Sequence, residues 1–147
     1  MTRSLWAGFA YFVIVFAAAF ALGFVRVAFI VPALGSLWAT LLELPFTLAV
    51  SWIVCGWLTR AIGVRSIGQA VGMGAGAFAL LMGAEVAGAI VLFGRSLEDH
   101  IGTYATAAGG LGLAGQIAFG LFPIVQYIRN AASPTRIDAA NDPKAAR

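Results

Sequence analysis

Charged residues are scarce in this chain of 147 residues: only 10% are Asp, Glu, Lys or Arg, whereas 61% are hydrophobic. A soluble domain usually carries about 25% charged residues. A soluble fold of this composition could not cover its surface with polar groups. The apolar residues must therefore face a second apolar phase, and lipid is the obvious one.

Cysteine and histidine are equally rare, with Cys55 and His100 the single examples. One cysteine excludes an intramolecular disulfide and a cysteine-rich metal site, and its place in an apolar run is typical of a buried, inert thiol. His100 follows Glu98 and Asp99, but three consecutive residues do not converge on one ion. We therefore interpret this stretch as a solvated loop, and predict no metal site, no cofactor and no enzymatic activity.

Long apolar runs are what the sequence does have. A helix needs about 20 apolar residues to cross a hydrocarbon core about 30 Å thick. Four runs qualify, at about 5–31, 37–58, 67–93 and 104–128. The predicted fold class is all-α, an integral membrane bundle of four transmembrane helices that forms one domain over 1–128. The polar remainder, 129–147, can bury little and is predicted to be a flexible tail.

Basic residues predict the orientation of this bundle. One side collects Arg3, Arg60, Arg65, Arg129, Arg136, Lys144 and Arg147. The other side has Arg95 outside the segments, next to Glu98 and Asp99. Cytoplasmic loops carry an excess of Lys and Arg, so both termini are expected in the cytoplasm. Topology thus accounts for the pI of about 9.6, and no nucleic acid is expected as a partner.

Small residues recur every fourth position in the third and fourth runs. The third has Gly68, Gly72 and Gly76, followed by Ala79 and Gly83, and the fourth has Ala108, Gly112, Gln116 and Gly120. Such stripes allow helices to approach closely in lipid. They fit either an oligomer seam or packing between neighbours of one bundle, and glycine's frequency in membrane helices favours internal packing.

A polar stripe follows the second run, where Glu43, Thr47, Ser51 and Cys55 lie four residues apart. This spacing keeps them near one helix face. The stripe could line a transport pathway, or Thr47 and Ser51 could hydrogen-bond carbonyl groups of their own helix. We favour the structural interpretation.

Three ionisable residues, Arg26, Glu43 and Glu85, lie inside the apolar runs. Such residues are costly at membrane depth and persist when they are paired or useful. A rise of 1.5 Å per residue puts all three roughly 8–12 Å below the outer boundary. Because the first two runs are joined by a short turn, Arg26 can meet Glu43. We predict that ion pair, with Glu85 as a second partner or a protonated acid.

Two prolines lie inside predicted helices, Pro45 in the second run and Pro123 in the fourth. A proline within a helix removes one backbone hydrogen bond and leaves a carbonyl group free. Both positions are therefore predicted to kink their helices and to release a carbonyl group within the membrane.

A longer pattern carries a family resemblance. It consists of Gly23-x-x-Arg26, then Pro32 and Gly35, then Glu43-Leu44-Pro45, and later Met82-Gly83-Ala84-Glu85, Arg95-Ser96-Leu97 and Phe119-Gly120-Leu121-Phe122-Pro123. The stretch from about Tyr11 to Ile128 resembles a group of small uncharacterised bacterial inner-membrane proteins. The typical Thr and Ile of that group are Phe24 and Val25 here. The resemblance implies a multi-pass protein of the bacterial inner membrane and transfers no activity or site residues.

Two function classes fit these features. The first is a non-enzymatic accessory or structural membrane subunit, with the lipid bilayer and either a second copy or a larger membrane complex as partners. The alternative is a small oligomeric permease or proton-coupled carrier that uses Arg26, Glu43 and Glu85. We favour the first, because four helices rarely enclose a pathway by themselves.

Overall fold

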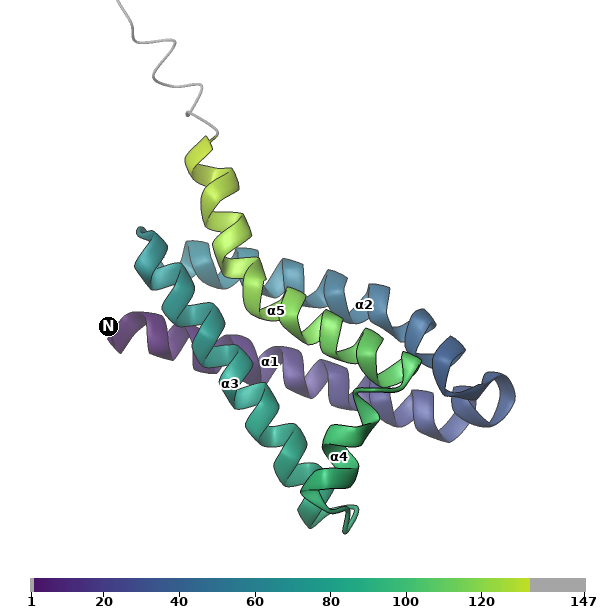
Figure 1. Ribbon diagram of the computed structural model, residues 1–147. Helices are drawn as coiled ribbons and strands as arrows, with labels where there is room; N and C mark the ends of the chain where they lie inside the picture. The colour runs from purple at the N-terminus through teal and green to yellow at the C-terminus, as the bar shows by residue number, and fades with distance from the viewer. Residues whose placement is uncertain (1, 133–147) are drawn as a thin grey trace, which may run out of the picture.

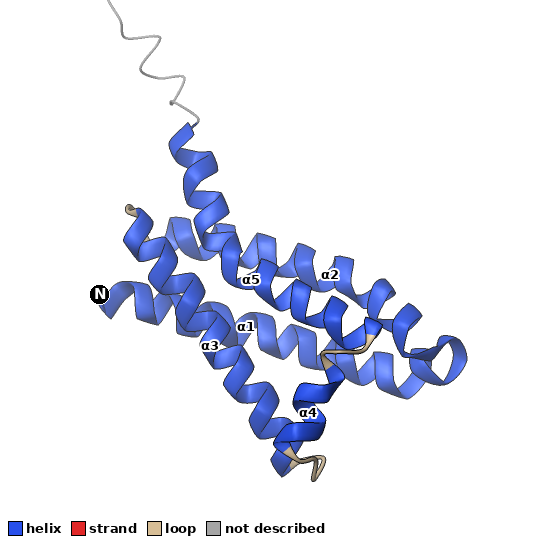
Figure 2. Ribbon diagram, in the orientation of Figure 1, coloured by secondary structure: helices blue, strands red, loops and turns tan. Residues whose placement is uncertain are grey.

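The computed structural model describes residues 2–132, and over these residues the chain is helical with no strand (Figure 1, Figure 2). The predicted all-α fold class is thereby confirmed. The elements are α1 (Thr2–Val25), a π-helical turn η1 (Arg26–Ile30), α2 (Val31–Ile62), α3 (Ile67–Val91), α4 (Leu97–Thr103) and α5 (Ala107–Ala132). Four of these helices are long, one for each apolar run.

Several boundaries differ from the predicted ones: α1 ends at Val25, before the predicted 31, and α2 begins at Val31, before the predicted 37. Residues 94–103, expected as a loop, contain the short helix α4. Residues 129–132, assigned to the polar tail, form the last turn of α5. The rest of the predicted tail lies outside the described residues.

Within residues 2–132, three helical stretches are long and apolar enough to cross a membrane: Arg3–Ile62, Ile67–Val91 and Ala107–Ala132. The first is 60 residues long and contains a reversal, so α1 and α2 lie side by side as two arms (Figure 1). Gly35 makes that reversal possible, because its φ of 77° and ψ of 166° are open to a residue without a side chain. The non-helical backbone of α2 lies at Gly35 and not at Pro45.

Each long helix packs against two others, in the ring order α1, α2, α5, α3. The chain start, the α2–α3 connection and the end of α5 gather on one side of the molecule (Figure 1). The α1–α2 reversal and the α3–α4 connection lie away from that side and apart from each other. Consequently Arg3, Arg60, Arg65 and Arg129 share one end of the bundle.

Glycine allows close helix contacts at Gly8, Gly74 and Gly120, of which Gly120 alone belongs to a predicted spacing-four stripe. A Cβ on Gly74 would overlap the backbone oxygen of Gly120 in α5, and one on Gly8 would lie 2.8 Å from the Met73 oxygen. Within the stripe, Gly72 and Gly76 contact α1, whereas Gly68 and Gly83 face open space. The close α3–α5 crossing therefore depends on Gly74, which lies outside the stripe of the third run.

Helix α4 begins with a capping box. The Ser96 hydroxyl accepts from the backbone N–H of Asp99 at 3.0 Å, and the Asp99 carboxylate accepts from the backbone N–H of Ser96 at 3.4 Å. The Ser96 hydroxyl also donates to that carboxylate at 2.7 Å. These bonds hold the pKa of Asp99 below its ordinary value. The cap fixes where α4 starts and so places His100 and Tyr104.

Candidate functional site

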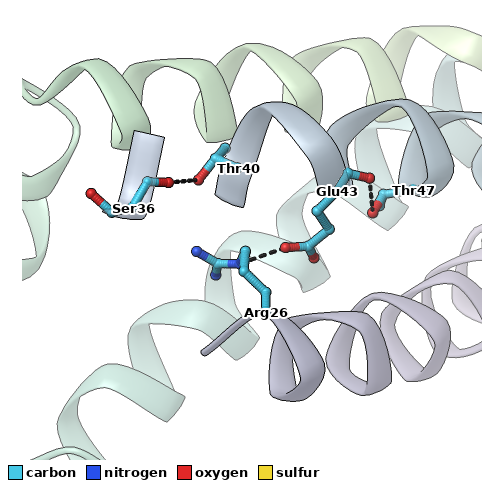
Figure 3. Close-up of polar contacts among 5 residues, drawn as sticks. All are labelled: Arg26, Ser36, Thr40, Glu43 and Thr47. Carbon is cyan, nitrogen blue, oxygen red and sulfur yellow. Dashed lines mark hydrogen bonds and ion pairs between the residues drawn. The ribbon is translucent and has the colours of Figure 1, made fainter. Parts of the chain in front are cut away.

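Arg26 and Glu43 meet near the α1–α2 reversal, with the Arg26 Nε 2.5 Å from the Glu43 Oε2 (Figure 3). Arg26 is the first residue of the π-helical turn, a type of distortion that occurs often at functional sites. The two side chains are 31% and 17% exposed. The terminal nitrogens of the guanidinium point away from the carboxylate (Figure 3). Only one edge of the guanidinium therefore engages Glu43.

The polar residues of the stripe after Glu43 bond to their own helix. Thr47 donates to the backbone oxygen of Glu43 at 3.2 Å (Figure 3). Ser51 donates to the backbone oxygen of Thr47 at 2.7 Å. Cys55, one turn further, is fully buried. The structural interpretation of the stripe expects these hydrogen bonds, because it has the hydroxyl groups of Thr47 and Ser51 donate to carbonyl groups of α2 itself.

Glu85 belongs to a second polar cluster, built by α3, α5 and the segment after α4. Its carboxylate accepts from Gln116 Nε2 at 2.5 Å and from the Tyr104 hydroxyl at 3.4 Å. The carboxylate is held by these groups and not by Arg26, so of the two predicted roles for Glu85 the second partner of Arg26 is not seen among the described residues, and the protonated acid stays a prediction. The reason lies in the packing of the π-helical turn that carries Arg26, because η1 contacts α1 and α2 but not α3.

Tyr104 extends this cluster toward the surface. Its hydroxyl lies 3.1 Å from His100 Nε2, and the two rings are 5.3 Å apart. One O–H donates one proton, so when Tyr104 donates to Glu85 its oxygen accepts from His100. Burial, together with the neighbouring Glu85 carboxylate, raises the pKa of Tyr104 above its ordinary value. His100, interpreted from sequence as a solvated loop residue, is instead half-buried on α4.

A third polar contact lies in the core and involves Tyr11, which the sequence analysis did not select. Its ring is fully buried and stacks on Phe119, with centroids 4.3 Å apart. Its hydroxyl donates to the Phe119 backbone oxygen at 3.1 Å. Pro123 has no N–H for this oxygen four residues earlier, so Tyr11 satisfies the carbonyl group that the proline leaves free. A tyrosine mid-helix and a proline in another helix were the available signals.

Replacing Tyr11 with phenylalanine should lower the free energy of unfolding by about 1–2 kcal/mol, since the buried Phe119 carbonyl would lose its partner while the ring packing remains. Unfolding in detergent micelles by titration with sodium dodecyl sulfate measures the change. Tyr127→Phe is the control, because that hydroxyl has no hydrogen-bond partner among residues 2–132. Equal effects of both substitutions would contradict the assigned role.

Metal-ligating side chains are dispersed over the part of the chain that the structure describes. No group of three or more His, Cys, Asp or Glu residues that could hold an ion occurs among residues 2–132. The ionisable groups inside the helices therefore meet arginine, amide and hydroxyl partners.

Comparisons of the chain with protein-family models, with curated proteins and with solved structures found no match. The family resemblance of the stretch from Tyr11 to Ile128 stays a prediction. What can be concluded about function comes from the two clusters around Glu43 and Glu85 and from the apolar exterior.

Proposed function

We propose that this chain is a multi-pass protein of the bacterial inner (plasma) membrane, with both termini in the cytoplasm. We further propose that it acts as a non-enzymatic accessory or structural subunit of a larger membrane assembly. The proposal has three parts, which are insertion, orientation and role, and each has its own support.

Insertion is supported by the exterior of the bundle. Large apolar side chains are exposed on all four long helices, among them Phe20, Phe46, Leu80 and Leu121. Apolar surface of this extent would aggregate in water and is stable when lipid or another protein covers it. Helices also satisfy their own backbone hydrogen bonds, as a membrane-spanning segment requires.

Orientation is supported by the common end that holds Arg3, Arg60, Arg65 and Arg129. Arginine and lysine are enriched on the cytoplasmic side of membrane proteins. Arg95 and the acidic pair Glu98 and Asp99 follow the other end of α3, the end distant from Arg65. This distribution favours cytoplasmic termini.

The structural role rests on one observation: Arg26, Glu43 and Glu85 each have a partner from another segment of the same chain. Arg26 pairs with Glu43 across the α1–α2 reversal, and Glu85 joins Gln116 and Tyr104. Buried polar partners of this kind fix helix register and identity of neighbours. The charges thus serve to hold the bundle together, which leaves the apolar exterior as the surface for partner subunits.

Purification from native membranes in a mild detergent tests this proposal. We expect the chain to remain in membranes after an alkaline wash and to co-purify with larger membrane proteins, identified by mass spectrometry. Reconstituted alone in vesicles, it should pass no more protons than protein-free vesicles do. Release by the alkaline wash would contradict insertion, and recovery of the chain without any partner would contradict the accessory role.

The alternative, a proton-coupled carrier, is favoured by a series of hydrogen bonds. His100 on α4 contacts the Tyr104 hydroxyl, which in turn donates to the carboxylate of Glu85 inside α3. Groups linked in this way can pass protons. In the same vesicle experiment, a proton flux that Glu85→Gln abolishes would replace the accessory role by this one. Arg26 and Glu43 would not take part, because their pair belongs to the other cluster.

A further inference from the structure

A cavity lies between α2 and α5 at the basic end of the bundle. Its volume is about 310 Å³. It is lined by Trp52, Ile53, Gly56, Arg60, Gln126, Arg129 and Asn130. A volume of about 300–1,000 Å³ is typical of small-molecule sites. The cavity is therefore large enough for a ligand the size of a lipid headgroup.

Two features of the sequence create this space. Pro123 lies inside α5, whose last turns lean away from the neighbouring helices (Figure 1), as a proline within a helix causes. Gly56 on α2 leaves room for Gln126, whose Oε1 would lie 3.2 Å from a Cβ at that position. Gln126 is 6% exposed and donates from Nε2 to the Trp52 backbone oxygen at 2.7 Å. The cavity is thus bounded by an ordered polar wall.

Among residues 2–132, the charges that line the cavity have one sign. Arg60 comes from the last turn of α2 and Arg129 from the last turn of α5, and no acidic residue of this part of the chain lines it. The Arg129 guanidinium carbon lies 5.1 Å from the Trp52 ring centroid, a cation–π contact that positions the side chain. Paired arginines are suited to phosphate, because the planar guanidinium offers two parallel donors.

We propose that this cavity binds the phosphate group of an anionic phospholipid from the cytoplasmic leaflet. Ile53 lines the cavity and is 68% exposed, and Trp57 on the same helix is 56% exposed. An apolar outer face of α2 therefore adjoins the arginines, so acyl chains can lie along it while the phosphate contacts Arg60 and Arg129. Basic pockets between membrane helices on the cytoplasmic side recognise such headgroups. The inference rests on the membrane orientation proposed above.

Lipid titration of the full-length chain in neutral detergent, followed by native mass spectrometry, tests this site without relying on membrane insertion. Phosphatidylglycerol should bind with one molecule per chain, and phosphatidylcholine should bind more weakly. Arg60→Gln and Arg129→Gln should each weaken phosphatidylglycerol binding about fivefold, the effect of about 1 kcal/mol per arginine. Arg129→Lys should retain more binding than Arg129→Gln because it keeps the charge.

The matched control is Arg65→Gln, which removes a charge at the same end of the bundle but outside the cavity. Binding in this variant should equal that of the original chain. An equal loss in Arg65→Gln would show general surface attraction and overturn the site. Saturable binding of free glycerol phosphate with the affinity of the lipid would overturn the lipid as its source and assign the cavity to a soluble anion.

Discussion

Replacing Arg26 with alanine should destabilise the bundle by about 2–3 kcal/mol. This lies between the value of about 0–1 kcal/mol for an exposed ion pair and about 3–5 kcal/mol for breaking a buried one, as the partial exposure of Arg26 and Glu43 requires. Most of the loss comes from Glu43, whose carboxylate would lose the charge 2.5 Å from it. The free energy of unfolding in detergent micelles measures the effect.

A double-mutant cycle separates the pair from other effects of the substitution. Glu43→Gln should be less costly than Arg26→Ala, and the double variant should recover part of the loss, with a coupling energy of about 0.5–3 kcal/mol. Arg95→Ala is the control, because that exposed arginine lies between α3 and α4 and is not part of the Arg26–Glu43 ion pair. Additive effects of the two single substitutions would show that the contact contributes nothing to stability.

The sequence was sufficient to place Arg26 beside Glu43, and the reason is connectivity. Helices joined by a short turn are neighbours, so similar depth in the two arms means proximity. The same depth estimate did not place Glu85, because depth along a helix axis carries no information on which helices are adjacent. Helix α3 packs against α1, but Arg26 lies on the π-helical turn η1, which contacts α1 and α2 and not α3.

The sequence analysis also missed the contacts of Tyr104 and Tyr11, and both failures have physical causes. The capping pair Ser96 and Asp99 is visible in the sequence, but a helix as short as α4 carries too few residues for a periodic pattern. The direction in which Tyr104, the residue after α4, points could therefore not be predicted. Tyr11 lies in α1 and its acceptor in α5, 108 residues away, and such a contact depends on how α5 is seated in the ring of helices.

Replacing Gly74 with alanine should also have a large effect and lower the free energy of unfolding by about 2–3 kcal/mol. A Cβ at this position would overlap the Gly120 backbone oxygen and lie 3.6 Å from the Pro123 Cδ. Because the obstacle is backbone, α3 and α5 must move apart, and overpacking of this kind typically costs about 1–3 kcal/mol. The displacement would also disturb the Phe119 carbonyl that Tyr11 satisfies, one residue before Gly120.

Gly83→Ala in the same helix is the matched control, because among residues 2–132 no atom beyond the adjacent residues and backbone of its own helix lies within 4 Å of a Cβ at that position. Alanine there should stabilise the chain by up to about 1 kcal/mol, since it restricts the unfolded chain without strain. The two substitutions are chemically identical and are expected to change the free energy of unfolding in opposite directions. If Gly74→Ala were as well tolerated as Gly83→Ala, the close α3–α5 crossing would not exist in the protein. That result would favour the spacing-four stripe, which contains Gly83 but not Gly74, as the face of α3 that packs against α5.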